Sequence, residues 1–176
     1  MNNVVGGNFT SRLNMNLRED KHWSYGAGTF IAGTKAQRPF LAFAPVQTDK
    51  TKESLAEMMK EMRDIVGGRP ATDPELDKAK DLATRTLPGQ WETMRSVGAS
   101  IGEILRYGLP DDYFTTYPGR VRALKLNDVA AAAKKVVQPD KLVWVVVGDR
   151  AKIEDGIKSL GWGDIRLLDA DGNPPK

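Results

Sequence analysis

The sequence predicts a domain of the α/β class, in its α+β form, with a mostly antiparallel sheet covered by helices. Two extended segments, residues 24–34 and 39–48, flank the turn-like Gly33-Thr34-Lys35 and predict a β-hairpin. Helix-periodic segments follow this hairpin. The β-branched run at residues 142–147 predicts a strand buried on both faces. The length of 176 residues fits a single domain, residues 1–176.

Apolar residues at helical spacing predict helices on both sides of the hairpin. Before the hairpin, three residues share one helical face after the Gly6-Gly7 pair: Phe9, Leu13 and Leu17. After the hairpin, an apolar stripe covers residues 55–66 and ends at Gly67-Gly68. The three methionines of this stripe are interpreted as core, since helix-spaced Met more often packs inside than forms an adaptable binding surface.

Further helices and a short strand are predicted downstream. Thr72-Asp73-Pro74-Glu75 has the pattern of a capping box with Pro in the first turn, and it opens a helix that ends near Pro88. The other helices are expected at residues 92–107, with Gly108 as stop and Val97, Ile101, Ile104 and Leu105 buried; at 111–117, interrupted by Pro118; after Asn127 as a cap; and at 153–160. The strand is expected at residues 165–168.

The residue counts exclude several kinds of chemistry. The chain has no Cys and one His, which excludes a catalytic thiol, a disulfide scaffold, a Cys-based zinc site and any site that needs two imidazoles. The 26 basic and 23 acidic residues give a net charge of +3 with interspersed signs, whereas nucleic-acid binding needs a coherent basic field. No apolar run approaches the ~20 residues that span a bilayer. Residues 1–10 show no signal-peptide pattern.

Three features have residue types that could carry out catalytic or metal chemistry, but their surroundings do not fit that chemistry. Gly98-Ala99-Ser100-Ile101-Gly102 fits the G-x-S-x-G nucleophile elbow, which needs a strand before the Ser, but helical spacing places Ser100 within a helix. His22 lies in a polar connection and is interpreted as solvated or as capping a helix end rather than as a metal ligand. Asp111-Asp112 opens a predicted helix, where negative charge suits the helix dipole, and this disfavours a general acid or base there.

A set of short segments gives the chain a more specific signature. They are Val4-Val5-Gly6-Gly7-Asn8-Phe9-Thr10-Ser11-Arg12-Leu13, Leu17-Arg18-Glu19-Asp20-Lys21, Ser24-Tyr25-Gly26-Ala27, Pro45-Val46-Gln47-Thr48-Asp49-Lys50-Thr51, Leu109-Pro110-Asp111-Asp112-Tyr113 and Val146-Val147-Gly148-Asp149-Arg150. Together they resemble the pitrilysin/insulinase family of zinc metallopeptidases, over nearly the whole chain. In detail the chain is most similar to the C-terminal end of a long bacterial zinc protease of that family.

The resemblance implies a clamshell of homologous domains around a peptide chamber. In the family, an H-x-x-E-H helix of the first domain holds Zn²⁺ and supplies the general base. This chain has no such motif, so it is similar to the inactive, C-terminal type of domain. We therefore expect no cofactor and no metal here, with zinc on a catalytic domain of the same polypeptide or of a partner subunit. Alone, the chain is expected to be inactive.

The resemblance also implies two substrate-binding residues, and it assigns no catalytic residue to this chain. The substrate-contacting Arg and Tyr of the family lie seven residues apart across this helix-to-strand junction, and Arg18 and Tyr25 match that spacing. A protonated phenol can donate a hydrogen bond to a developing oxyanion, and a guanidinium offers forked donors to substrate carbonyls. The alternative interpretation is that Arg18 complements a helix C-terminus and Tyr25 packs on a strand.

The expected function is the substrate-binding, non-catalytic half of a zinc metalloendopeptidase acting on peptides. A purely structural or assembly module of the same fold is the alternative. Family domains usually begin with a strand and a helix before the G-G-x-F segment, so we expect a domain truncated at its N-terminus. Its uncovered sheet edge predicts a homodimer. Nucleic-acid and membrane partners are not expected. The family's long bacterial members imply a periplasmic location, with the cytoplasm as the alternative.

Overall fold

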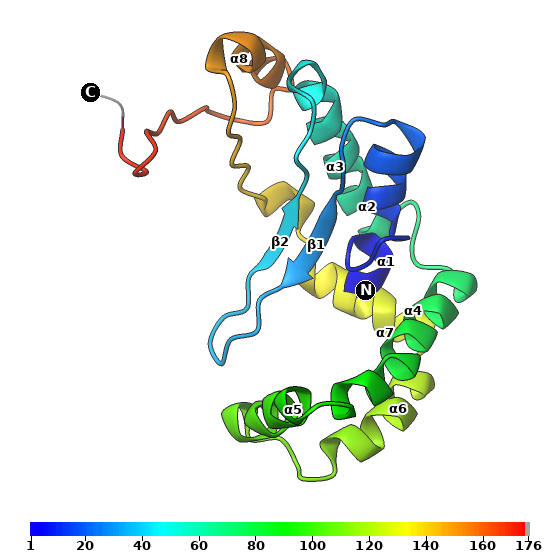
Figure 1. Ribbon diagram of the computed structural model, residues 1–176. Helices are drawn as coiled ribbons and strands as arrows, with labels where there is room; N and C mark the ends of the chain where they lie inside the picture. Colours follow the sequence, from blue (N-terminus) through cyan, green and yellow to red (C-terminus); the bar gives the residue numbers. More distant parts are fainter. Residues whose placement is uncertain (175–176) are drawn as a thin grey trace.

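The computed structural model describes residues 1–174, in which helices lie along one side and at the ends of one small antiparallel sheet (Figure 1). Strands β1 (Gly28–Ile31) and β2 (Phe40–Phe43) form a hairpin with Gly28 opposite Phe43 and Ile31 opposite Phe40. The predicted hairpin and the α+β class are therefore confirmed. The α-helices are α1 (Asn2–Val5), α2 (Arg12–Asn14), α3 (Thr51–Val66), α4 (Asp73–Arg85), α5 (Met94–Tyr107), α6 (Tyr113–Ala123), α7 (Leu126–Val136) and α8 (Arg150–Lys158).

Four short helical turns of other types connect these elements. Three are 3₁₀ turns, η2 (Thr48–Lys50), η3 (Leu87–Trp91) and η4 (Pro139–Lys141). The fourth, η1 (Met15–Asp20), is a π-helix that continues directly from α2. No helix within residues 1–174 combines the length and apolar character that crossing a membrane requires.

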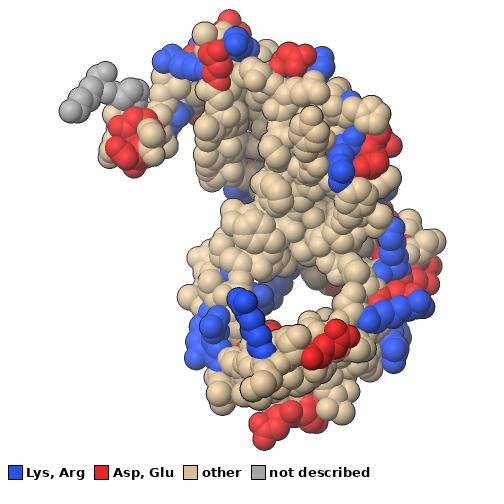
Figure 2. All heavy atoms as spheres, in the orientation of Figure 1, with Lys and Arg blue, Asp and Glu red and all other residues tan. Residues whose placement is uncertain are grey.

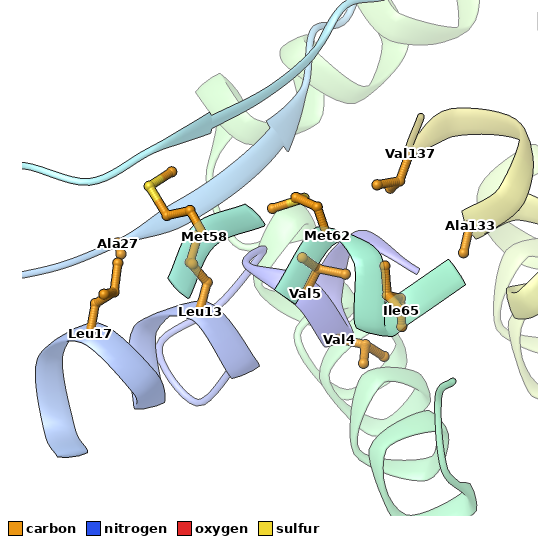
Figure 3. Close-up of a cluster of buried hydrophobic side chains, with 10 residues drawn as sticks. All are labelled: Val4, Val5, Leu13, Leu17, Ala27, Met58, Met62, Ile65, Ala133 and Val137. Atoms are coloured by element: carbon orange, nitrogen blue, oxygen red, sulfur yellow. The ribbon is translucent and has the colours of Figure 1, made fainter. Parts of the chain in front are cut away.

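The hydrophobic core lies where α3 packs against the N-terminal helices, the sheet and α7 (Figure 3). Met58 and Met62 project from α3 into this core, as the helical stripe predicts. Burial of each large apolar side chain stabilises the fold by roughly 1.5–3 kcal/mol. The full cluster comprises Val4, Val5, Leu13, Leu17, Ala27, Met58, Met62, Ile65, Ala133 and Val137.

Two helix boundaries form as their sequence signals predict. The Thr72 backbone N–H donates to Glu75 Oε2 at 2.9 Å, which completes the capping box of α4. Gly108 ends α5 with φ 61°, in the left-handed region that glycine enters without a Cβ clash. Ser100 lies within α5 and is buried, so the G-x-S-x-G letters form no nucleophile elbow.

The prediction of two strands after residue 140 is wrong. Residues 142–147 are extended, but no backbone hydrogen bond joins them to a neighbour within residues 1–174, and Val143 and Val145 are exposed rather than buried. Residues 165–168 belong to a tail that leaves the body of the molecule (Figure 1). A β-strand is defined by its pairing, and neither segment has a pairing partner among the described residues.

The arm formed by α5 and α6 is less buried than the sequence predicts. It curves away from the body of the molecule and leaves an opening, which Figure 2 shows. Ile101 and Leu105 were predicted to be buried but are exposed, while Val97 and Ile104 are partly buried. Pro118 does not interrupt α6, because its fixed φ is helical and only one hydrogen bond is lost.

The predicted cap of α7 is also wrong. The N-cap is Lys125, whose N–H donates to Asp128 Oδ2 at 2.8 Å, and Asn127 already lies within the helix. The carboxylate three residues into the helix therefore satisfies the backbone donor that precedes it.

Candidate functional site

The predicted residues Arg18 and Tyr25 line one open groove of about 960 Å³. Arg18 lies in the last turn of η1, and Tyr25 lies in the loop that leads to β1. The opposite wall comes from the segment that follows β2. The groove residues are Arg18, Glu19, His22, Trp23, Ser24, Tyr25, Pro45, Val46 and Gln47.

The Arg18 side chain is held by its neighbours but stays accessible. Its guanidinium carbon lies 4.5 Å from the centre of the Phe9 ring, a cation–π contact, and its Nε lies 3.4 Å from Glu19 Oε1. The side chain is 37% exposed. Arg18 does lie near the end of η1, as the alternative interpretation requires, but no hydrogen bond from it to a helix carbonyl is found within residues 1–174. Its donors can therefore reach a bound molecule.

Tyr25 is 95% exposed, and its hydroxyl has no hydrogen-bond partner in the described part of the chain. The alternative interpretation of Tyr25 as a strand-packing residue is wrong, because so exposed a ring packs against almost nothing. A phenol is both a donor and an acceptor, and here both capacities point away from the protein.

The turn between η1 and β1 has a strained backbone at His22. His22 has φ 56°, a left-handed conformation that is uncommon for residues other than glycine. Its Nδ1 lies 3.1 Å from the Arg18 carbonyl oxygen, so the ring caps the end of η1, as one of its two predicted roles. π-Helical turns and strained residues cluster at functional sites in proteins.

Hydrogen bonds fix the two walls of the groove relative to each other. Ser24 Oγ donates to the Pro45 carbonyl oxygen at 2.7 Å, and Ser24 pairs with Val46 in an isolated antiparallel bridge. The Gln47 side chain donates to the His22 carbonyl oxygen at 3.1 Å, and the Gln47 backbone N–H donates to the Trp23 carbonyl oxygen at 2.9 Å. Tyr25 thus projects from an anchored loop.

Sequence reasoning missed two polar residues that position this segment. Asn14 Oδ1 accepts from the Ala27 N–H at 3.1 Å, and its Nδ2 donates to the Phe9 carbonyl oxygen at 2.6 Å. The side chain of Arg12 is only 7% exposed and binds Glu75 at the start of α4. Arg12 belongs to the first motif segment and Asn14 follows directly after it, but the sequence alone does not distinguish a buried polar residue from a solvated one.

Comparison with known proteins identifies the fold that carries this groove. The family model of the peptidase M16 inactive domain matches residues 1–82, which contain both Arg18 and Tyr25. Over these residues, which are less than half of the chain, the sequence is similar to the peptidase M16 inactive domain. The resemblance found in the sequence is confirmed for this region, as that of a non-catalytic M16 domain. No curated protein matches the chain in sequence.

Solved structures from three bacteria share the fold of this M16 domain. The peptidase M16 inactive domain from Pseudomonas fluorescens is similar over 80% of this chain and 33% of its own, with 25% identity and a TM-score of 0.69. A conserved protein from Enterococcus faecalis covers 76% of this chain and 31% of its own, with 20% identity and a TM-score of 0.61. A protease from Helicobacter pylori covers 78% and 33%, with 17% identity and a TM-score of 0.60. The chain thus spans about a third of the length of each of these structures.

The described residues of the M16 domain do not fit a zinc site. Within residues 1–174 no three His, Cys, Asp or Glu side chains are placed to hold a metal ion together. Zinc sites in proteins use His, Cys and carboxylate ligands, and this chain offers one imidazole and no thiol. That imidazole belongs to His22, which caps η1. What the groove offers is a set of hydrogen-bond donors.

Charge on the M16 domain is mixed rather than concentrated. Figure 2 shows basic and acidic side chains interspersed over the visible face. Several form local pairs, such as Lys60 with Asp64 at 2.6 Å and Arg85 with Asp81 at 2.8 Å. In these surface pairs the two charges compensate each other. In the groove, Arg18 is the basic residue, and it lies near the carboxylate of Glu19 and beside an exposed Tyr25.

Proposed function

We propose that this M16 domain binds peptides in the groove between Arg18 and Tyr25, as the non-catalytic, substrate-binding half of a zinc metalloendopeptidase. One observation carries the proposal: a fully accessible phenol, unpartnered within the described residues, opens onto the same groove as an accessible guanidinium. Peptide backbones present carbonyl oxygens, which are the acceptors that both groups require.

The two side chains have different tasks in this proposal. The Arg18 guanidinium offers forked donors that hold a substrate carbonyl in a fixed orientation. The Tyr25 hydroxyl donates to the oxygen that gains negative charge as the peptide bond is attacked, which is an interaction stronger in the transition state than in the ground state. The hydrogen bonds at Ser24 and Gln47 keep the loop of Tyr25 in place, so little ordering is needed on binding.

The reaction itself needs a second domain. We propose that a domain with an H-x-x-E-H motif, in the same polypeptide or in a partner subunit, holds the zinc ion and faces this groove across a peptide chamber. The length of the solved relatives, about three times the length of this chain that they match, leaves room for such a domain. We further propose a bacterial, periplasmic protein, with the cytoplasm as the alternative, and a homodimer formed through the sheet edge.

A structural or assembly role is the second candidate. The observation that favours it is the contact of the Arg18 guanidinium with the Phe9 ring at 4.5 Å, which a purely packing role would also produce. The two candidates differ in one respect that can be measured: only the first requires that peptides bind in the groove.

Fluorescence anisotropy with labelled β-casein, an unfolded polypeptide, separates the two candidates. We expect saturable binding, and we expect Arg18→Gln and Tyr25→Phe each to raise Kd roughly two- to tenfold, the effect of one net hydrogen bond. Arg106→Gln on α5 and Tyr113→Phe on α6 are matched controls that should leave Kd unchanged. The absence of saturable binding, or equal losses in the controls, would support the structural role.

A further inference from the structure

Asn14 is a buried polar residue on the helical segment that carries Arg18. It is the last residue of α2, which continues directly into η1, and it is only 4% exposed. Asparagine lies mostly at protein surfaces, and burial of a side-chain amide is unfavourable unless its polar atoms are paired. A buried Asn within a helical segment is therefore expected to have partners for both its donor and its acceptor.

The donor and the acceptor of the Asn14 amide bind two different segments of the chain. Nδ2 donates to the Phe9 carbonyl oxygen at 2.6 Å, and the ring of Phe9 is the surface on which the Arg18 guanidinium lies, at 4.5 Å. Oδ1 accepts from the Ala27 N–H at 3.1 Å, two residues after Tyr25. One side chain therefore joins the residue that supports Arg18 to the segment that carries Tyr25.

The turn at Tyr25 is hydrogen-bonded on both sides of this residue. Ser24 Oγ accepts from the Gly26 N–H at 3.1 Å and lies 2.9 Å from the Gly26 carbonyl oxygen. Ala27 follows directly, is only 7% exposed and leads into β1. Because this short turn is closed by its own hydrogen bonds, the place of Tyr25 follows from where Asn14 holds Ala27.

We propose that Asn14 is the positioning residue of the groove: its amide sets the placement of the Arg18 guanidinium relative to the Tyr25 hydroxyl and does not touch a bound peptide. A planar amide offers a donor and an acceptor on one rigid group, and the backbone groups of Phe9 and Ala27 require one of each. Both ligand-binding side chains are thus in place before a peptide arrives, which is pre-organisation. The inference rests on the proposed function for its effect on binding, but not for its effect on geometry.

Asn16 offers a matched comparison on the same helical segment. Its Nδ2 donates to Glu57 Oε2 at 2.9 Å and to Glu61 Oε1 at 3.0 Å, and both carboxylates belong to α3. Removal of either amide costs two hydrogen bonds, but only the bonds of Asn14 lead to Arg18 and Tyr25. A merely structural role of Asn14 would make the two removals alike.

A double-mutant cycle on the full chain, read by anisotropy with labelled β-casein, tests the proposal. We expect Asn14→Ala to raise Kd roughly four- to a hundredfold, the combined effect of the Arg18 and Tyr25 contacts. In that background Arg18→Gln and Tyr25→Phe should each add less than about twofold, because their contacts are already lost. Asn16→Ala should leave Kd unchanged. Equal increases in the two alanine variants, or fully additive effects in Asn14→Ala, would overturn the positioning role.

A second readout needs no peptide and separates failure of this inference from failure of the proposed function. In the wild-type chain the ring current of Phe9 should shift the Arg18 Nε–H proton resonance upfield, and the Ala27 amide should exchange slowly with solvent. Asn14→Ala should abolish both effects. If the wild-type chain binds no casein, the proposed function is wrong, and these two resonances decide the positioning role.

Asn14→Asp keeps the experiment decisive if Asn14→Ala fails to fold, because Asp has nearly the same shape as Asn. At pH 8 its carboxylate still accepts from the Ala27 N–H but cannot donate to the Phe9 carbonyl oxygen. This variant should therefore change the Arg18 resonance and leave the Ala27 amide protected. An unchanged Arg18 resonance in Asn14→Asp, or rapid exchange of the Ala27 amide in the wild-type chain, would contradict the proposal.

Discussion

The guanidinium of Arg12 binds both carboxylate oxygens of Glu75, with Nε 2.5 Å from Oε1 and Nη2 2.6 Å from Oε2. The same side chain donates to the carbonyl oxygens of Arg69 and Pro70 at 2.5 and 2.9 Å. A bidentate, largely buried pair of this kind is far more specific in geometry than a surface ion pair. It ties the segment that carries the candidate groove to the start of α4.

Loss of this anchor should destabilise the domain. Arg12→Met keeps the length of the side chain but removes the guanidinium that pairs with Glu75 and donates to two carbonyl groups, at a cost on the order of 3 kcal/mol. Guanidinium chloride unfolding at fixed protein concentration measures the change. Arg85→Met, which breaks an exposed pair with Asp81, is the matched control and should shift the midpoint little. Equal shifts in both variants would refute a special role for Arg12.

The same pair predicts how stability depends on pH. Burial opposes ionisation of Glu75, but hydrogen bonds from Arg12 and Thr72 outweigh it and lower the pKa to about 2. Because the folded pKa lies below the unfolded one, the unfolded state binds more protons between pH 4.5 and pH 2. The stabilisation is therefore complete above that window and lost as pH falls through it. Unfolding midpoints measured from pH 2 to 6 should show a shallower dependence in Glu75→Gln, and identical slopes would contradict the assignment.

Two glycine substitutions should have opposite effects. A Cβ added at Gly6 would lie 2.5 Å from the Thr29 backbone nitrogen, which donates to the Gly6 carbonyl oxygen at 2.9 Å. Gly6→Ala should thus cost about 2 kcal/mol by pushing β1 away from α1. Gly98 in α5 has open space around it, and Gly98→Ala should stabilise the helix by about 0.5–1 kcal/mol. Thermal unfolding compares the two, and a destabilised Gly98→Ala would contradict the exposed position of α5.

The elements that could be predicted from sequence are those with local signals. Thr72 and Glu75 lie three residues apart, so their capping box is visible in the letters, and the stripe of α3 is likewise contiguous. Residues 142–147 have the local pattern of a buried strand, but a strand also needs a neighbour, and a local pattern does not reveal whether one is present. The prediction that the apolar stripe of α5 is buried was wrong for the same reason, because burial depends on which element packs against that stripe.

The candidate site could likewise be predicted only where local sequence signals exist. Arg18 and Tyr25 were found through the family resemblance, and their common groove depends on the turn at His22, whose left-handed backbone is uncommon for residues other than glycine. The partner of Arg12 lies 63 residues away in Glu75. An ion pair over such a separation leaves no periodicity or spacing to detect, although both residues belong to recognisable segments.

Catalysis in the assembled protease should reveal the task of Tyr25. When this domain is combined with the proposed H-x-x-E-H domain, Tyr25→Phe should lower kcat about a hundredfold and change KM much less, because a donor to the developing oxyanion acts mainly in the transition state. Steady-state kinetics on a labelled peptide gives both constants, with Tyr113→Phe as the control. An unchanged kcat would leave Tyr25 without a catalytic effect.

The central claim is that peptides bind between Arg18 and Tyr25, and an NMR titration tests it most directly. Unlabelled β-casein peptide is added to the ¹⁵N-labelled chain, and backbone amide shifts are followed. We predict that the largest changes fall on the groove segments, residues 18–25 and 46–47, and that they diminish in Tyr25→Phe. Changes confined to other surfaces, or no changes at saturating peptide, would contradict the claim.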